Sequence, residues 1–366
     1  MFVSINASMF RYIMVRTGFI FVVLIIILSM NFILLKLAPE FPPANEDQKN
    51  LWLVQQVEKG YKYEILEMQP DVVLAFTRNE IEIVEGAYFR MGDNNDRTRL
   101  YVPVPIASQY FVWITDIVTD WDWGVSTRIE VNRPAFLVLS ARMPVTLKLN
   151  FLALFVYIPI GFGLGILAAL KKNSVTDNII SLGVMIFISV PSFVVMTLLV
   201  YILGYELEWV PYKWTPAYVG GWEAVKAYLI PVLGLSFGAI AGLTRLTRAE
   251  ITEVLTSEFL LLARTKGLTR GQAIVRHAMR NSMVPLVPSI IGSFVGLLSG
   301  SVIIENIYYI PGTGSVYLEA LTRNSYDYNV ILVSTAFYTT IGLIAVLFVD
   351  LSYGIVDPRI RMGARK

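Results

Sequence analysis

The charged side chains of residues 245–285 are the part of the chain whose residue types and spacing could do chemistry. Seven Lys or Arg and three Glu occur there, between two long apolar runs. Such side chains form charge-assisted hydrogen bonds with a partner protein, and the basic ones also bind anionic lipid headgroups. Residues 245–285 are therefore the candidate functional site, and both kinds of partner are open at this point.

Other kinds of chemistry are excluded because the residue types they need are missing. The chain has no Cys and a single His, His277, so thiol chemistry is impossible and a His-based metal site or triad is not expected. No Gly-x-x-x-x-Gly-Lys-Ser/Thr phosphate loop occurs, so the chain is not expected to hydrolyse ATP. The middles of the apolar runs hold no Asp, Glu, Lys, Arg or His, which argues against an ion-coupled carrier. No paired carboxylates or Ser/His/Asp set appears inside them, so a membrane hydrolase is not expected either. We expect a non-enzymatic, passive path that takes its energy from elsewhere, most simply through residues 245–285.

The local pattern of this site predicts two helices joined by a sharp corner. One helix is expected to run from Arg245 to about Lys266. Gly267 then supplies the left-handed residue that commonly ends a helix. Thr269 and Gln272 have the spacing of a capping box, which predicts the start of the second helix. A corner of this kind would hold the charged side chains in a rigid arrangement.

Six apolar runs surround this site, and each is long enough to cross a bilayer core, which needs about 20 helical residues. They cover residues 17–35, 149–170, 178–204, 227–244, 282–304 and 329–349. The chain is 55% hydrophobic and 16% charged, with a mean hydropathy of +0.59, which predicts an all-α polytopic membrane protein with six transmembrane helices. The positive-inside rule places both termini in the cytoplasm, because 15 Lys or Arg then lie inside against three in the two short outer loops.

A long connection, residues 38–143, follows the first apolar run and is predicted to fold as a small extracytoplasmic α+β subdomain. A helix is expected over residues 46–59, with Leu51, Val54 and Val57 on one side and Gly60 as its stop. Residue patterns predict strands at 72–77, 80–89 and 99–104, and a turn at 92–96. A further helix over 106–119 would lie on the membrane surface through four aromatic residues, Tyr110, Phe111, Trp113 and Trp121.

These elements divide the chain into three parts. Residues 1–37 form the N-terminus and the first transmembrane helix, and residues 38–143 form the extracytoplasmic subdomain. Residues 144–366 form the transmembrane core, with the cytoplasmic loop 245–281 inside it.

Residues 263–268 (ARTKGL) and 277–285 (HAMRNSMVP) resemble the EAA loop of permease subunits of bacterial ABC importers, in its oligopeptide and dipeptide version. Ala263 and Gly267 match the general pattern of that loop. Leu261 and Leu262 replace its first Glu-Ala, and residues 277–280 depart from its usual ending in the way that the peptide permeases do.

Further fragments are similar to this family in the same order along the chain. They are WGVS at 123–126, RMPVTL at 142–147, PSF at 191–193, WVP at 209–211, LIPVL at 229–233, ENIYYIPGTG at 305–314 and DLSYGIVDPRIR at 350–361. The resemblance covers about residues 10–37 and 120–366. Residues 45–104 depart from it as an enlargement of the first outer loop, whose role the resemblance does not assign.

The resemblance implies the type I ABC importer permease fold and an ATP-driven import of oligopeptides or dipeptides across the bacterial cytoplasmic membrane. It implies a second homologous permease subunit, two ATPase subunits that hold ATP and Mg, and an extracytoplasmic solute-binding protein. This chain itself would bind membrane lipid but no cofactor, metal or nucleic acid. A permease for nickel chelates or oligosaccharides is the nearest alternative, and a stand-alone channel or ion-coupled carrier is the alternative from another class.

The resemblance further implies that the loop is the coupling element seated in a groove of an ATPase. The residues expected to make that contact are Glu258, Phe259, Leu262, Ala263, Arg264, Lys266, Gly267, Arg270, His277, Arg280 and Asn281. The alternative for the whole set is a basic amphipathic helix lying on anionic lipid. For His277, a pH-sensitive contact is weighed against an ordinary surface residue satisfied by a neighbour, and the second interpretation is favoured.

A second candidate site is the turn after the fifth apolar run, with Glu305, Pro311, Gly312 and Gly314. It would close an outer gate or touch the binding protein, and the alternative is a plain tight turn.

Smaller expectations concern residues within and beside the spans. Gly161, Gly163 and Gly165 are expected to allow close helix packing. Asp350 and Asp357 are candidates to pair with Arg245 or Arg248. Polar side chains that either face a solute path or bond within their own helix are Asn31, Ser189, Ser299 and Ser301. An interfacial aromatic belt is expected from Trp209, Tyr212, Trp214, Tyr218 and Trp222.

Overall fold

The computed structural model of the chain describes residues 7–38, 40, 42–43, 45–68, 87–91, 98–215, 220–322 and 326–356. The chain forms two compact units. The large unit contains residues 1–24, 140–318 and 337–366, and the small unit contains residues 25–139 and 319–336. The first and last long helices, α1 (Ala7–Leu37) and α14 (Tyr328–Val356), each contribute one part to each unit.

Among the described residues, five helices are long and apolar enough to cross a membrane. They correspond to α1, α6 (Met143–Leu170), α9 (Gly221–Leu255), α12 (Met279–Ile307) and α14. Five of the six predicted apolar runs lie inside these helices. The interpretation as a helical, multi-span membrane protein is confirmed.

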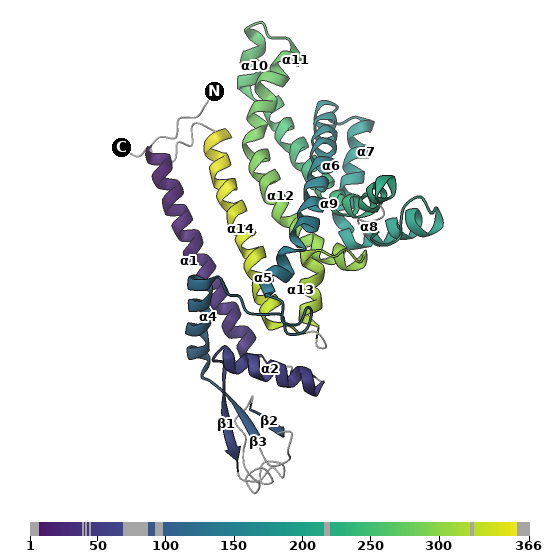
Figure 1. The fold of residues 1–366 in the computed structure, drawn as a ribbon. Helices are drawn as coiled ribbons and strands as arrows, with labels where there is room; N and C mark the ends of the chain where they lie inside the picture. The colour runs from purple at the N-terminus through teal and green to yellow at the C-terminus, as the bar shows by residue number, and fades with distance from the viewer. Residues whose placement is uncertain are drawn as a thin grey trace. The chain divides into compact units, whose positions relative to one another are not determined.

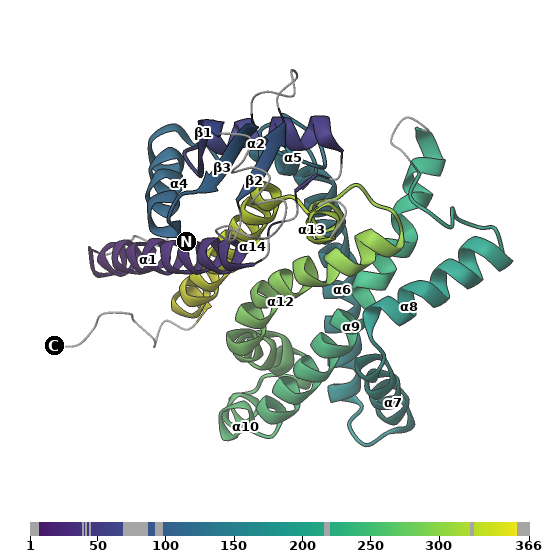
Figure 2. The same ribbon diagram turned by 90° about the horizontal axis from the view of Figure 1, so that it is seen from below.

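The remaining run, residues 178–204, is not one straight helix as predicted. It consists of α7 (Val175–Ser189) and α8 (Ser192–Leu199), which continues as the π-helix η1 (Val200–Glu206), with a bend of 98° between the halves. Figures 1 and 2 show α7 and α8 pointing in different directions. The bend falls at Pro191, because proline lacks an N–H and forces the preceding Val190 into an extended conformation (φ −94°, ψ 122°). If the bent pair counts as one span, the described residues contain six candidate membrane spans.

The large unit is held together by close packing of α6 against α9. A Cβ on Gly165 would lie 2.5 Å from the Thr247 Cβ, and a Cβ on Gly161 would lie 3.1 Å from the Ile240 carbonyl oxygen. The Thr244 hydroxyl also donates to the Gly161 carbonyl at 3.2 Å. Small residues let helix backbones approach within a membrane, where apolar contact gives little driving force of its own. The predicted packing role therefore holds for Gly161 and Gly165, whereas Gly163 faces open space.

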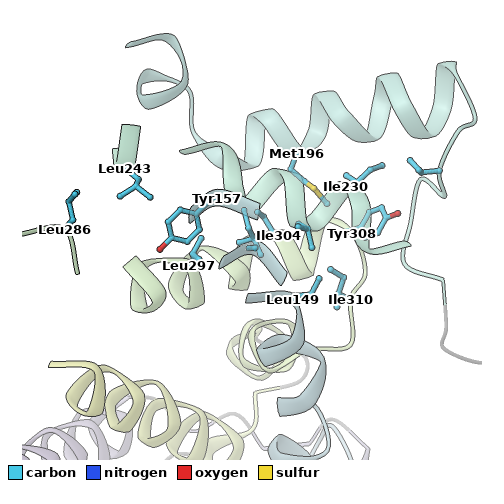
Figure 3. Packing of buried hydrophobic residues seen from close by; sticks show 14 residues of the cluster. Leu149, Tyr157, Met196, Ile230, Leu243, Leu286, Leu297, Ile304, Tyr308 and Ile310 are labelled. Carbon is cyan, nitrogen blue, oxygen red and sulfur yellow. The ribbon is translucent and has the colours of Figure 1, made fainter. Parts of the chain in front are cut away.

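One apolar cluster fills the interior of the large unit (Figure 3). Its residues on α6 and α9 are Leu149, Ala153, Tyr157, Ile230, Val232, Leu235 and Leu243. Its remaining members, on α8, on α12 and in the connecting segments, are Met196, Val210, Leu286, Leu297, Ile304, Tyr308 and Ile310. The Tyr308 hydroxyl donates to the Pro211 carbonyl, which ties the segments after η1 and α12 together.

The small unit combines helices with a short antiparallel sheet. Its helices include the last part of α1, α2 (Glu46–Glu58), α4 (Ile106–Asp120), most of α5 (Ala135–Ser140) and the start of α14. The strands β1 (Lys62–Met68), β2 (Tyr88–Met91) and β3 (Thr98–Pro103) pair in the order β1-β3-β2, with Tyr63 opposite Val102. The helices at 46–59 and 106–119 and the strand at 99–104 agree with prediction.

Other predictions for this region differ from the structure or lie outside it. Strand β1 was not predicted, and the predicted strand 80–89 is described only at its end, as part of β2. The predicted strand 72–77 and turn 92–96 lie outside the described residues.

The buried faces of the two predicted helices also differ from expectation. Leu53 is the fully buried residue of α2, while Leu51 and Val54 are exposed. On α4, Trp113 is buried and stacks on Phe32 of α1 with ring centroids 4.7 Å apart. Trp113 is thus a core residue of the small unit and not an interface residue as predicted, because α4 packs along the end of α1 (Figure 1).

A buried carboxylate from a distant part of the chain fixes the turn after α4. Asp327, fully buried just before α14, accepts hydrogen bonds from the Ser126 hydroxyl (2.6 Å) and the Thr127 and Arg128 N–H groups (2.9 and 3.0 Å). Backbone N–H groups that converge on one carboxylate form charge-assisted bonds, so Asp327 fixes residues 126–128 to the start of α14 within the small unit.

Candidate functional site

The predicted helix, corner and second helix are present at residues 245–281, but the first helix is interrupted. Helix α9 ends at Leu255, and α10 (Glu258–Thr265) begins after Thr256 and Ser257. The Ser257 and Thr256 hydroxyls donate to the Val254 and Glu253 carbonyls at 2.6 and 2.9 Å. Hydroxyl side chains that bond to the preceding turn favour helix ends, which explains why the single helix predicted through Lys266 is wrong.

The corner itself has the predicted geometry. Gly267 has φ +94°, in the region that favours glycine. Its N–H donates to the Arg264 carbonyl (3.0 Å), and the Leu268 N–H donates to the Ala263 carbonyl (3.4 Å). This pair of bonds is the Schellman motif, which satisfies carbonyls that the end of α10 would leave open. The corner is therefore fixed by backbone hydrogen bonds.

A capping box starts the second arm of the corner. The Thr269 hydroxyl accepts from the Gln272 N–H (3.3 Å), and the Gln272 side chain accepts from the Thr269 N–H (3.1 Å). Helix α11 (Arg270–Ala273) follows and continues through the π-helix η3 (Ile274–Ala278) into α12. Figure 1 shows α10 and α11 side by side at the ends of the longer α9 and α12.

The inner face of the corner is a small apolar core of its own. Leu260, Ala273 and Ala278 are buried there, with Leu255 and Leu268 packed against them. Ala263 is also buried, at 7% exposure. Of the residues predicted to contact a partner, Ala263 therefore faces inward.

The outer face carries exposed apolar side chains. Phe259 and Leu262 are 42% and 56% exposed, as an anchor for a partner requires. Leu261 and Val275, at 63% and 64%, belong to the same class, and the sequence analysis did not single them out as contacts. Exposed apolar residues on a short helix with a separate buried face are the signal that could have found them.

Charged side chains surround these apolar residues. All of the following are exposed: Glu258, Arg264, Lys266, Arg270 and Arg280. Within the described part of the chain, none of the five takes part in an ion pair. Asn281 is also exposed, and His277 is half-buried. We call Glu258, Phe259, Leu262, Arg264 and Lys266 the corner surface.

An ion pair anchors α9 before it reaches the corner. Arg248 donates to both oxygens of Asp177, from Nε at 2.6 Å and from Nη2 at 2.8 Å. Asp177 is almost fully buried in the first turn of α7 and also accepts from the Asn173 N–H at 2.9 Å. The bidentate geometry joins α7 to α9 two turns ahead of the end of α9.

This contact corrects one pairing prediction. Arg248 pairs with Asp177, and Asp350 pairs with Arg16 at 2.6 Å, so the expected contact of Asp350 with Arg245 or Arg248 is wrong. Neither partner is near in sequence to the residue it meets, so local pattern could not select it. Asp357 lies outside the described residues.

The second candidate site, the turn after α12, is a buried hydrogen-bond network. Glu305 is fully buried and accepts from the Thr146 hydroxyl (2.6 Å) and from the Gly314 and Ser315 N–H groups (2.7 and 3.2 Å). The Thr146 hydroxyl accepts in turn from the Thr313 N–H at 2.8 Å. The carboxylate thus fastens the end of α12 to α6 and to the first turn of α13 (Thr313–Leu321).

Glycine is required at two positions of this turn. A Cβ on Gly312 would collide with the Glu305 carboxylate, and a Cβ on Gly314 would collide with the Val302 backbone. Pro311 precedes them at an exposed position. Thr146 and Thr313 are the members that sequence reasoning missed, because Thr146 lies 159 residues from Glu305.

The remaining candidate residues have ordinary surroundings. Asn31, Ser189 and Ser301 each bond to a carbonyl within their own helix, and the Ser299 side chain is not described. The predicted belt is exposed at Trp209, Tyr212 and Trp222, whereas Trp214 packs on Tyr228 and Tyr218 is not described. Among the described residues, no three acidic or His side chains gather as metal ligands.

Long apolar helices, closely packed through small residues and joined by a polar helical corner, define a polytopic α-helical membrane protein. The chain belongs to the family of binding-protein-dependent transport system inner membrane components, whose model matches residues 161–362. It is a permease subunit of the ABC transporter class and not an enzyme.

Comparison with known proteins gives relatives over most of the length. The dipeptide transport system permease protein DppB of Lactococcus lactis subsp. cremoris (strain MG1363) is 30% identical over 354 residues, 97% of this chain and 100% of the relative. The oligopeptide transport system permease protein OppB of Escherichia coli (strain K12) is 34% identical over 270 residues, 73% of this chain and 84% of the relative. A solved structure of the MetNI methionine ABC transporter in inward-facing conformations matches with a TM-score of 0.44 and 18% identity, over 63% of this chain and 97% of that one.

The first of these relatives corrects the expected extent of the resemblance. Its alignment covers 97% of this chain, so it includes most of residues 45–104, which were expected to depart from the family. The enlarged loop is shared with that dipeptide permease.

Proposed function

We propose that this chain translocates oligopeptides or dipeptides as the permease subunit of an ATP-driven importer in the bacterial cytoplasmic membrane. The names of its relatives, dipeptide and oligopeptide transport system permeases, support the substrate class. The family description supports dependence on a solute-binding protein. The chain would form half of the path beside a second homologous permease, with both termini in the cytoplasm.

The corner surface is the proposed contact with an ATPase subunit, and this proposal rests on one observation. Phe259 and Leu262 are exposed on a helix whose opposite face, at Leu260 and Ala263, is already buried. An apolar anchor within a ring of charges that lack ion-pair partners in the described chain has the composition of a protein interface. The ATPase would hold ATP and Mg, and its closure would swing the corner as a rigid body and so move α9 and α12.

The rest of the predicted coupling set has two roles in this proposal. Arg264, Lys266, Arg270, Arg280 and Asn281 would make polar contacts with the ATPase groove. Ala263 and Gly267 shape the corner, because one is buried and the other holds the left-handed turn. His277, half-buried, is proposed only as a neighbour of the contact.

The Glu305 turn is proposed as a rigid element of the outer gate. Its carboxylate joins α12, α6 and α13 through three hydrogen bonds, so these segments would move together. Pro311, Gly312 and Gly314 would present the turn to the outside, toward the binding protein.

Affinity purification from gently solubilised membranes tests the assembly. Recovery of a second permease and of Walker-motif ATPases with the chain is expected, and the double variant Glu258→Gln with Arg280→Gln should lose the ATPases. A matched control neutralises Glu223 and Lys226, an exposed ion pair in the first turns of α9.

The control variant should keep its ATPases. Recovery of the chain alone, conducting without nucleotide, would support the stand-alone channel. Retention of the ATPases by the double variant would leave lipid as the partner of the corner surface.

A further inference from the structure

A lysine in the small unit lies at the end of α1 among aromatic rings. The Lys36 ammonium is 4.1 Å from the Tyr61 ring centroid and 4.5 Å from that of Tyr328. Cation–π contacts of this kind attract an ammonium but accept no hydrogen bond in the manner of an oxygen. Within the described residues, Lys36 makes no hydrogen bond and no ion pair.

The nearest carboxylate is already engaged. Glu40 lies 2.8 Å from the ammonium of Lys62, whose side chain is 1% exposed. Lys62 also lies over the Tyr88 ring, 4.9 Å from its centroid. Burial, together with the charge of Glu40 and a hydrogen bond to it, raises the pKa of Tyr88. Glu40 therefore pairs with Lys62, and its single negative charge faces the two ammonium groups of Lys36 and Lys62, which leaves one positive charge in excess among these three groups.

A cavity of about 50 Å³ lies beside Lys36, entirely within the small unit. Besides Lys36, its lining includes the Glu40 carboxylate and several side chains that can donate hydrogen bonds, among them Gln56, Tyr61 and Thr127. None of these three side chains makes a hydrogen bond within the described residues. These three side chains and the Lys36 ammonium, a cation that cannot accept, thus border one small space. Charges removed from water are normally paired, and Glu40 is already the acceptor of Lys62, so a second anionic acceptor would complete the site.

The volume limits what that acceptor can be. A cavity needs about 10–15 Å³ of such volume for each water-sized particle, so this one holds about three to five heavy atoms. A carboxylate has three heavy atoms and two acceptor oxygens, enough to take bonds from an ammonium and from an amide or hydroxyl at once. Trp52 and Tyr328, also in the lining, would cover the carbon next to it.

We propose that the cavity beside Lys36 is a binding site for the carboxylate of a small ligand, with Lys36, Gln56 and Thr127 as its donors. If the proposed function is right, the carboxylate available to this site is the free C-terminus of a transported peptide. The site would then select peptides with a free C-terminus over amidated ones. This last step rests on the proposed function, while the carboxylate site itself does not.

Ligand-observed NMR titration of the purified full chain in detergent micelles tests the site. The probes are acetate, the dipeptide Ala-Ala and its C-terminal amide, in a carboxylate-free buffer at constant ionic strength. Acetate and Ala-Ala should bind saturably, and the amide should bind at least about 10-fold more weakly, because hydrogen bonds to a charged group are the stronger ones.

Three variants locate the binding. Lys36→Met should weaken acetate binding roughly 10- to 100-fold and Thr127→Val roughly 5-fold, in proportion to the bonds removed. Lys172→Met, at an exposed position in the turn after α6 of the large unit, should leave binding unchanged. Thr127→Val keeps the test decisive if Lys36→Met does not fold.

The outcomes separate the site from the function. Absence of saturable acetate binding to the unmodified chain, equal binding by the amide, or full binding by both site variants would overturn the proposal. Acetate binding that depends on Lys36, in a chain that does not transport peptides, would support the carboxylate site and refute the proposed substrate.

Discussion

Replacing Gly267 by Ala should weaken coupling through backbone strain alone. Gly267 has φ +94°, and a Cβ built on it meets no atom within 4 Å. The substitution therefore removes no contact and creates no collision. Gly271, four residues later in α11, also has open space around a built Cβ but has no positive φ. The same substitution, Gly to Ala, is therefore expected to destabilise the local backbone at position 267 and to stabilise it at position 271.

The magnitudes follow from the two backbone conformations. An L-residue in the left-handed region costs about 1–2 kcal/mol, so Gly267→Ala should reduce the population of the native corner by about 5- to 30-fold relative to its alternatives. Gly267→Val should cost more, since β-branched residues tolerate this region least. Gly271→Ala replaces glycine in a helix, which stabilises by up to about 1 kcal/mol.

The assay is substrate-stimulated ATP hydrolysis by the reconstituted complex, with membrane insertion checked separately. Stimulation should fall in the order glycine, Ala, Val at position 267 and should be unchanged or slightly higher for Gly271→Ala. Wild-type stimulation by Gly267→Val, or an equal loss in Gly267→Ala and Gly271→Ala, would refute the role assigned to the corner.

Three other perturbations test the contacts that support the two sites. Thr146→Val should lower the free energy of unfolding by about 2–4 kcal/mol in a denaturant titration, because it leaves the Thr313 N–H without its acceptor and Glu305 without one donor. The control Thr197→Val, at an exposed hydroxyl, should change that free energy little. Equal losses in the two variants would contradict the network. Asp177→Asn should lower the free energy of unfolding by about 1–3 kcal/mol, less than for a fully buried pair, because the Arg248 side chain is 32% exposed. Asp350→Asn should lower it by under about 1 kcal/mol, because the Arg16 side chain is 41% exposed. A larger loss for Asp350→Asn than for Asp177→Asn would show that this pair does not join α7 and α9. Deleting residues 46–104 should leave the large unit folded, because its apolar cluster contains none of these residues. Limited proteolysis of the deletion variant should still yield a protected core. Aggregation or complete digestion would count against an independently folded large unit.

Local pattern was sufficient wherever the physical cause is local. Apolar runs long enough to span a bilayer predicted five long helices, since backbone hydrogen bonds in lipid must be satisfied within the segment itself. The corner at Gly267, Thr269 and Gln272 was predicted to the residue, because a left-handed glycine and a capping box act over three or four positions. The bend at Pro191 was equally local, and its signal was present in the sequence.

The arrangement of the candidate sites depended on contacts between distant residues. The packing of Leu260 with Ala273 and Ala278 decided which side of α10 is exposed. Tertiary packing likewise decided that α2 buries Leu53 in place of the predicted Leu51 and Val54. A periodic pattern shows that a helix has an apolar side, but the partner element determines which residues of it are covered.

The amino-acid sequence by itself determined the class of this protein, its long helices and the shape of its polar corner, because hydrophobic length, helix caps and glycine conformations are properties of neighbouring residues. Only the tertiary structure decided that Arg248 meets Asp177, that Glu305 meets Thr146, and that Lys36 borders a cavity with Gln56 and Thr127. These partners lie 20 to 159 residues apart along the chain, and a single polar residue has many possible partners at such separations. The choice among them is made by the packing of helices, which brings polar side chains from distant segments to the same place.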